Sequence, residues 1–200
     1  MNEHPILFTG EMVKAILDGR KTVTRRVIKP QPVFIEESFR WRWGKTGAVT
    51  ASREWWNYMD SLDHCPYGQP GDLLWVRETW AAHPTLNRVQ PKYLDCAEIY
   101  YRATCDNDSH YSWRPSIHMP RWASRITLEV TGVKGERLRG ISEDDARAEG
   151  VTPSGVGADL AHLKYRAGFQ TLWDTINAKR GHSWESNPWV WVVEFKQVQP

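Results

Sequence analysis

The stretch Ile16–Arg26, ILDGRKTVTRR, joins the end of a predicted helix to the start of a predicted strand. The helix is expected over Glu11–Asp18, where apolar side chains recur at helical spacing, and Gly19 stands where a helix commonly ends. Lys21 and Thr24 follow it. Residues three apart share one face of a helix but lie on opposite faces of a strand. The amine and the hydroxyl can therefore converge only if Lys21 still belongs to the turn before the strand.

Lys21 and Thr24 are candidates for a base and a nucleophile. A threonine hydroxyl is a weak nucleophile until a base accepts its proton, and a lysine can be that base only if its pKa falls from about 10.4. Burial or neighbouring cations lower a lysine pKa, and Arg20, Arg25 and Arg26 supply such cations. The same run of charge is also typical of a solvated basic turn or of a stripe that contacts phosphates.

Further segments carry the patterns of strands and helices. Strands are expected at Ile6–Phe8, Leu73–Arg77, Ile99–Arg102, Ile126–Arg137 and in the C-terminal run NPWVWVVEFK, Asn187–Lys196. Helices are expected around Arg53–Asp60, from Ser142 to Gly150 and over Ala158–Asn177. Ser142 and Asp145 have the spacing of a capping box, with Asp in place of the usual Glu or Gln. Several short strands with few helices between them favour an α+β fold built on a closed barrel.

The composition is that of one globular domain. Two hundred residues suit a single well-buried core. The formal net charge of +2 is too small to attract a polyanion by itself. Most of the twelve tryptophans are expected in the core, which leaves a few to stack on a base. Val33–Pro70 has no sustained periodicity and is expected to be a long loop region.

Cysteine usage and hydropathy indicate an ordinary reducing compartment. Cys65, Cys96 and Cys105 are an odd number without a CxxC pair, so neither a disulfide framework nor a zinc site is indicated. We expect no metal and no cofactor. The first residues do not resemble a signal peptide, and no apolar run approaches the roughly twenty residues of a membrane helix. We therefore expect a cytoplasmic protein without a membrane partner.

Four segments, in order and rough placement, resemble the ASCH family. They are the opening segment, GDLLWV at Gly71–Val76, RITLEVTGV at Arg125–Val133 and ISEDDARAEG at Ile141–Gly150. ASCH domains are similar to PUA domains, which are small β-barrels with helices across the openings, and PUA relatives bind RNA. The resemblance implies one PUA-like domain over residues 1–200, with flanking helices and long insertions at about 33–70 and 81–123.

Within that family the chain resembles the small bacterial N(4)-acetylcytidine amidohydrolases and longer ASCH proteins of phages and prophages. The amidohydrolases cleave an acyl group from the exocyclic amine of cytidine. The resemblance implies catalytic roles for Lys21 and Thr24, in RKTVTRR, and for Glu149, near the end of ISEDDARAEG. Either Thr24 attacks the acyl carbonyl and Lys21 takes its proton, or Thr24 holds a water with Lys21 or Glu149 as base. The sequence leaves both mechanisms open.

Three further residues are candidates for substrate binding. Arg26, or backbone N–H groups in the turn before the strand, would stabilise a developing oxyanion. Glu78 and Trp80, in VRETW, are expected to face the same cavity, because a carboxylate accepts hydrogen bonds from a base edge and tryptophan stacks on its face for about 1–3 kcal/mol. The alternative for Glu78 is an ion pair with Arg77 or another surface arginine.

Two other functions compete with an amidohydrolase acting on a small nucleoside. A noncatalytic RNA-binding module would use the tryptophans and the cations Arg20, Lys21, Arg25, Arg26 and Lys29. A ribonuclease would set Lys21 and Arg26 around a scissile phosphate. An RNA platform has no need of the helix-terminal carboxylate of Glu149, which favours the amidohydrolase. The sequence contains no GxSxG, Walker loop or GxGxxG.

Overall fold

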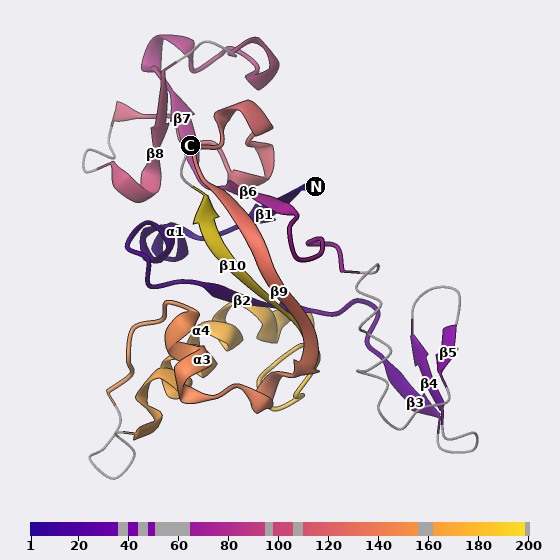
Figure 1. Ribbon diagram of the computed structural model, residues 1–200. Helices are drawn as coiled ribbons and strands as arrows, with labels where there is room; N and C mark the ends of the chain where they lie inside the picture. Colours follow the sequence, from indigo (N-terminus) through magenta and orange to yellow (C-terminus); the bar gives the residue numbers. More distant parts are fainter. Residues whose placement is uncertain are drawn as a thin grey trace.

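The computed structural model describes residues 1–35, 40–43, 48–50, 65–94, 98–105, 110–155 and 162–198 (Figure 1). The strands are β1 (Glu3–Leu7), β2 (Val23–Val27), β3 (Val33–Ile35), β4 (Arg40–Trp43), β5 (Ala48–Thr50), β6 (Leu73–Arg77), β7 (Trp80–Ala82), β8 (Ile99–Tyr101), β9 (Thr127–Arg137) and β10 (Trp189–Val198). The α-helices are α1 (Gly10–Leu17), α3 (Glu143–Ala148) and α4 (Lys164–Asn177). Of these helices, none is both long and apolar enough to cross a bilayer.

A five-stranded mixed sheet organises the fold, in the order β1-β6-β9-β10-β2. The pair β1 and β6 is parallel, and the other neighbours are antiparallel. Strand β10 lies between β9 and β2, and its first five residues, WVWVV, are all buried. A strand covered on both faces reads as a continuous apolar run because neither face meets water. The C-terminal run predicted as a buried strand is therefore confirmed.

The two faces of β10 belong to two different hydrophobic clusters. Trp191 and Val193 pack with residues of α1 and of the other sheet strands. Val190 and Val192 pack with Phe169 and other residues of α3 and α4. Figure 1 shows α1 on one side of β2 and the pair α3 and α4 on the other. The fold is thus an α+β arrangement with helices on both sides of the edge strand β2.

The sheet does not close into a barrel within the described residues, so the predicted closed barrel is not found. Strands β1 and β2 occupy the two opposite edges of the sheet, and no strand pairing joins them. Side chains bridge the gap instead. Arg26 of β2 donates through Nη2 to the Leu7 carbonyl at 2.6 Å, and its guanidinium lies 5.1 Å from the Phe8 ring.

The segment predicted as a long loop is partly β-structure. Strands β3, β4 and β5 form a separate three-stranded sheet, which Figure 1 shows away from the main sheet. The prediction of a loop was therefore wrong for β3, β4 and β5. Strands of three or four residues are too short to show the alternation by which a strand is recognised in a sequence. The helix predicted around Arg53–Asp60 lies outside the described residues. The second insertion expected from the sequence, 81–123, contains β8 and most of β7, which together form a two-stranded sheet. A third hydrophobic cluster, which includes Trp80, Met119 and Ala123, packs there.

Helix α3 begins and ends as the sequence indicates. Ser142 accepts from the Asp145 backbone N–H, Asp145 accepts from the Ser142 N–H, and this reciprocal capping box confirms the predicted start. The helix ends at Glu149, followed by Gly150 with φ of +76°. A Cβ at Gly150 would lie 2.8 Å from the Cβ atoms of both Ala15 and Lys21. Glycine therefore lets the end of α3 approach the turn after α1.

The two glycines Gly150 and Gly19 provide a matched test of that approach. Both have positive φ, but a Cβ at Gly19 would meet nothing within 4 Å. Gly19→Ala should therefore cost only the strain of a left-handed backbone, about 1–2 kcal/mol. Gly150→Ala should cost about 1–3 kcal/mol more, because two packed side chains must move. Urea unfolding of the two variants measures the difference, and equal costs would contradict the close packing at Gly150.

Candidate functional site

Lys21 is buried at the junction of α1, α3 and β2. It precedes the first residue of β2 and forms an isolated antiparallel bridge with Glu149, so the condition set by the sequence spacing is met. Its Nζ donates to Glu149 Oε2 at 2.6 Å, to the Val23 carbonyl at 2.8 Å and to the Glu149 carbonyl at 3.0 Å. The side chain is 0% exposed. The turn and the tight Gly150 contact together bring the amine to the carboxylate.

Burial lowers the pKa of Lys21. The dominant cause is the loss of hydration around the charged form, and the cations Arg25 and Arg26 act in the same direction. The carboxylate of Glu149 opposes this shift by attraction and by hydrogen bonding. The net direction is downward, since burial outweighs the ion pair. A lysine of this kind loses its proton at a lower pH than a solvated one.

Arg25 holds a cluster of carboxylates on the other side of Glu149. Its guanidinium, 0% exposed, contacts Glu136 Oε1 at 2.8 Å and Asp145 Oδ2 at 3.1 Å. It also lies 3.5 Å from Glu149 Oε1. Each carboxylate oxygen of Glu149 therefore faces a different buried cation. The side chain has one defined orientation, because rotating it would separate it from both partners.

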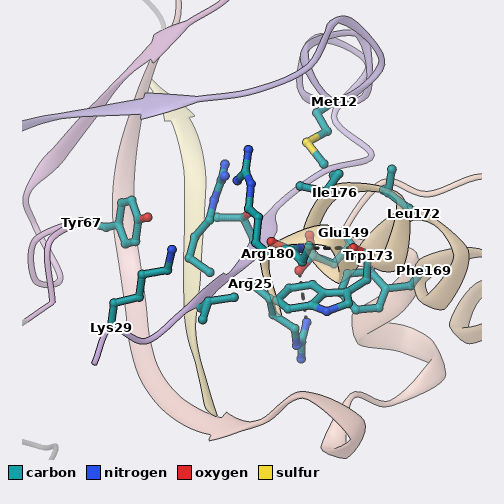
Figure 2. A pocket seen from close by; sticks show the side chains of 14 residues that line it. Met12, Arg25, Lys29, Tyr67, Glu149, Phe169, Leu172, Trp173, Ile176 and Arg180 are labelled. Atoms are coloured by element: carbon teal, nitrogen blue, oxygen red, sulfur yellow. Dashed lines mark hydrogen bonds and ion pairs between the residues drawn. The ribbon is translucent and has the colours of Figure 1, made fainter. Parts of the chain in front are cut away.

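Thr24 and Glu149 line the same cavity, which has a volume of about 250 Å³. Figure 2 shows Tyr67 and Lys29 on one side of Glu149, and Phe169 and Leu172 on the other. The described lining residues are Met12, Thr24, Arg25, Arg26, Val27, Lys29, Tyr67, Glu149, Phe169, Leu172, Trp173, Ile176, Asn177 and Arg180. Lys21 is absent from this set of described residues. The carboxylate therefore meets the cavity, and the amine lies behind it.

The cavity follows the free edge of β2. This strand is the last in the sheet order, so one of its edges is unpaired within the described residues. The Ile28 N–H donates to the Trp189 carbonyl at 3.0 Å, toward β10. Since strand residues alternate, Arg25 and Val27 turn their backbone N–H and C=O groups to the free edge. The cavity wall thus offers backbone donors and acceptors as well as side chains.

Thr24 is a buried residue whose hydroxyl has no hydrogen-bond partner among the described residues. The residue is 3% exposed and lies in the first half of β2, paired with Val193 of β10. A hydroxyl that lines a cavity without an internal partner is available to a ligand or a water. Of the three residues for which catalytic roles are expected, Thr24 and Glu149 therefore line one cavity, whereas Lys21 is not among its described lining residues.

Arg26 also lines the cavity and is largely buried. Burial lowers its pKa, and the nearby Tyr67 and Glu149 oppose that shift. Its Nη2 donates to Leu7, whereas Nε is buried without a hydrogen-bond partner among the described residues. An unsatisfied buried donor of a charged group is costly, so a ligand oxygen here would gain a strong hydrogen bond.

Glu78 and Trp80 are not among the described residues that line this cavity. Glu78 forms a two-pronged ion pair with Arg125, at 2.9 and 3.0 Å. An ion pair was the alternative considered from the sequence for Glu78, and its partner is Arg125, not the neighbouring Arg77. Trp80 is 0% exposed and packs in its own cluster against the edge of Trp122, with ring centroids 6.1 Å apart. A ring so covered has no free face for stacking. The predicted placement of both residues at the cavity is corrected.

Sequence reasoning missed the wall that α4 contributes. Phe169, Leu172, Trp173 and Ile176 recur at helical spacing, a pattern that by itself indicates core. In the structure these residues also border the cavity, and Trp173 donates through Nε1 to the His182 carbonyl at 2.8 Å. Their role as cavity lining becomes visible only in the structure, where residues of α4 and β2 border the same cavity. Within the described residues, no three His, Cys, Asp or Glu side chains could hold a metal ion.

The comparisons with known proteins give one structural likeness. No protein-family model and no curated protein sequence matches the chain. Among solved structures, the chain is similar to the ASCH domain from Lactobacillus crispatus JV V101, with 13% sequence identity and a TM-score of 0.42. The alignment covers 98% of this chain and 79% of that chain. A TM-score of this size is too low to decide function, which must rest on the side chains described above.

The buried pair should dominate the stability of this site. Glu149→Gln leaves the Lys21 ammonium ion buried with only neutral acceptors, and breaking a buried pair costs about 3–5 kcal/mol. Replacing both partners, as in Lys21→Met with Glu149→Leu, should recover much of that loss. The matched control is Glu3→Gln, which breaks the exposed Arg121 pair and should hardly change stability. Urea unfolding of all four proteins tests this, and equal effects at Glu149 and Glu3 would contradict it.

Proposed function

We propose that the chain is an amidohydrolase that removes an acyl group from the exocyclic amine of an N(4)-acylated cytosine nucleoside. The observation that carries this proposal is one cavity lined by an unpartnered Thr24 hydroxyl and by the Glu149 carboxylate, with Lys21 buried behind it. The residues are those for which the sequence resembles the bacterial N(4)-acetylcytidine amidohydrolases. Acyl transfer requires a nucleophile and a base that a substrate can meet in one cavity.

In this proposal Glu149 accepts the proton and Lys21 positions Glu149. An ammonium ion has three donors, and Lys21 Nζ already contacts three acceptors, two of them carbonyls. A neutral amine would have only two donors for those acceptors. The geometry therefore favours the ammonium form in the resting protein. Glu149, which borders the cavity, is the group that a substrate can reach.

The reaction would proceed by two acyl transfers. Thr24 Oγ forms a bond to the acyl carbon while its proton passes to Glu149. The bond between the acyl carbon and the exocyclic nitrogen then breaks, and Glu149 returns the proton to the leaving amine. Water, with Glu149 as base, hydrolyses the threonine ester and releases the carboxylic acid. The guanidinium of Arg26, which lines the cavity, would stabilise the oxyanion in each step.

RNA binding by the basic run is less well supported. Two of the cations proposed for phosphate contact, Lys21 and Arg25, have side chains that are 0% exposed and bound to carboxylates. Arg20 pairs with Asp18 at 2.9 Å on the surface. Phosphate contacts require accessible charge. Three of the four cations in RKTVTRR therefore form ion pairs with carboxylates of the chain itself. The fourth, Arg26, lines the cavity.

Thr24→Val tests the nucleophile. The substitution keeps the shape of the side chain and removes its hydroxyl, so turnover of N(4)-acetylcytidine to cytidine should fall by orders of magnitude. Thr24→Ser should retain activity. Thr22→Val is the matched control, because Thr22 lies just before β2 and outside the described cavity lining. A chelator should leave the wild-type rate unchanged. Full activity of Thr24→Val, or no turnover by the wild type, would refute the proposal.

The pH dependence distinguishes the two roles of Lys21. Because burial lowers its pKa, the ammonium ion is lost as the pH rises, at a pH below the ordinary value of about 10.4. If the ammonium ion holds Glu149, kcat/KM should fall through that range. A rate that instead rises through it would make the neutral amine the base. Tryptophan fluorescence over the same range, as a control, shows whether the fold persists.

A further inference from the structure

The cavity combines an apolar wall with a cationic opening. Phe169, Leu172 and Ile176 of α4 lie on one side of Glu149 in Figure 2, together with Met12 of α1. On the other side, Lys29 extends toward Tyr67. Arg180, which ends the short helix after α4, lines the same cavity. A ligand that fits both parts has a flat apolar portion and a negatively charged portion.

The cations at the opening have no internal counter-ion among the described residues. Lys29 and Arg180 are exposed, and neither lies within 4.0 Å of a described carboxylate. The one carboxylate in the described lining, Glu149, is already held by Lys21 and Arg25. The charge of Lys29 also acts on its surroundings, since it adds to the burial that lowers the pKa of His182. This end of the cavity is therefore positively charged and accessible.

We propose that the cavity takes a cytosine nucleotide, whose phosphate binds Lys29 and Arg180 while the acylated base lies at Thr24 and Glu149. The inference rests on the proposed function for the position of the base and adds a phosphate site to it. The two cations come from different segments, one just after β2 and one at the end of the short helix after α4, and both line the cavity. At an exposed opening a phosphate keeps part of its hydration, which limits the desolvation cost of binding.

Product binding tests this assignment independently of turnover. Cytidine 5′-monophosphate should bind to the whole chain at least about 10-fold more tightly than cytidine, the ratio that corresponds to 1.4 kcal/mol. The advantage should shrink as salt is added, because exposed charges are screened. Equal calorimetric affinities for the two would overturn the phosphate site. Turnover of N(4)-acetylcytidine, measured separately, decides the proposed function, so the two failures are distinguishable.

Charge-removing variants locate the phosphate. Lys29→Met and Arg180→Met should each reduce the preference for the monophosphate over cytidine, measured as the ratio of the two affinities in the same variant, to under about 3-fold. Lys179→Met is the matched control, because Lys179 carries the same charge beside Arg180 and is not among the described lining residues. An effect of Lys179→Met equal to that of Arg180→Met would overturn the assignment, because it would show that the phosphate responds to the overall positive charge and not to a direct contact.

A dinucleotide distinguishes the two sources of such a phosphate. Cytidylyl-3′,5′-cytidine carries a phosphodiester, as RNA does, and cytidine 5′-monophosphate carries a monoester. A monoester has more negative charge for the same two cations, so the monophosphate should bind more tightly. The assignment to a mononucleotide would be overturned if the dinucleotide bound more tightly than the monophosphate and Lys29→Met removed that binding. The site would then be assigned to an RNA strand.

Discussion

The fold of the site depends on placing one ammonium ion and one carboxylate together without water. Lys21 lies in the turn between α1 and β2, and Glu149 is the C-cap of α3. The two residues are 128 positions apart in the chain, and their side chains are in contact at 2.6 Å. Taking either charge out of water alone would cost several kcal/mol, so neither side chain can occupy its position without the other. The bridge between their backbones and the missing Cβ at Gly150 serve this requirement. The burial of the Lys21 ammonium ion and the backbone geometry at Gly150 therefore depend on each other.

The candidate site also depends on the position of β2 at the edge of the sheet. A central strand has both sets of backbone groups engaged, and its side chains are covered from both faces. Strand β2 has one free edge, so side chains from both of its faces and its backbone reach a single cavity. Arg25 packs toward the carboxylate cluster on one face, while Thr24 and Arg26 follow the other. An edge strand is usually a liability for aggregation, and here the helices on either side cover it.

Local patterns in the sequence predicted the elements well, because each carries its own signal. The alternation in LLWVR, the capping box at Ser142 and the apolar run WVWVV each depend on residues close in the chain, and each element is found. Long-range contacts were harder. Nothing near Glu78 in sequence shows that Arg125 will neutralise it, and nothing near Trp80 shows which cluster will cover it. The open sheet was missed for the same reason, since closure depends on whether β1 and β2 meet.

The position of β10 in the sheet has a consequence for the order in which the chain folds. Strand β2 lies near the beginning of the sequence, but within the described residues its strand partner is β10, with Val23 paired to Glu194. Closing so long a loop is entropically costly, and pairings of this kind are formed late and slowly. During synthesis, β2 would therefore wait until β10 has been made before the two strands could pair. In a partly made chain that lacks β10, strand β2 would have no partner among the described strands and would be exposed to chaperones.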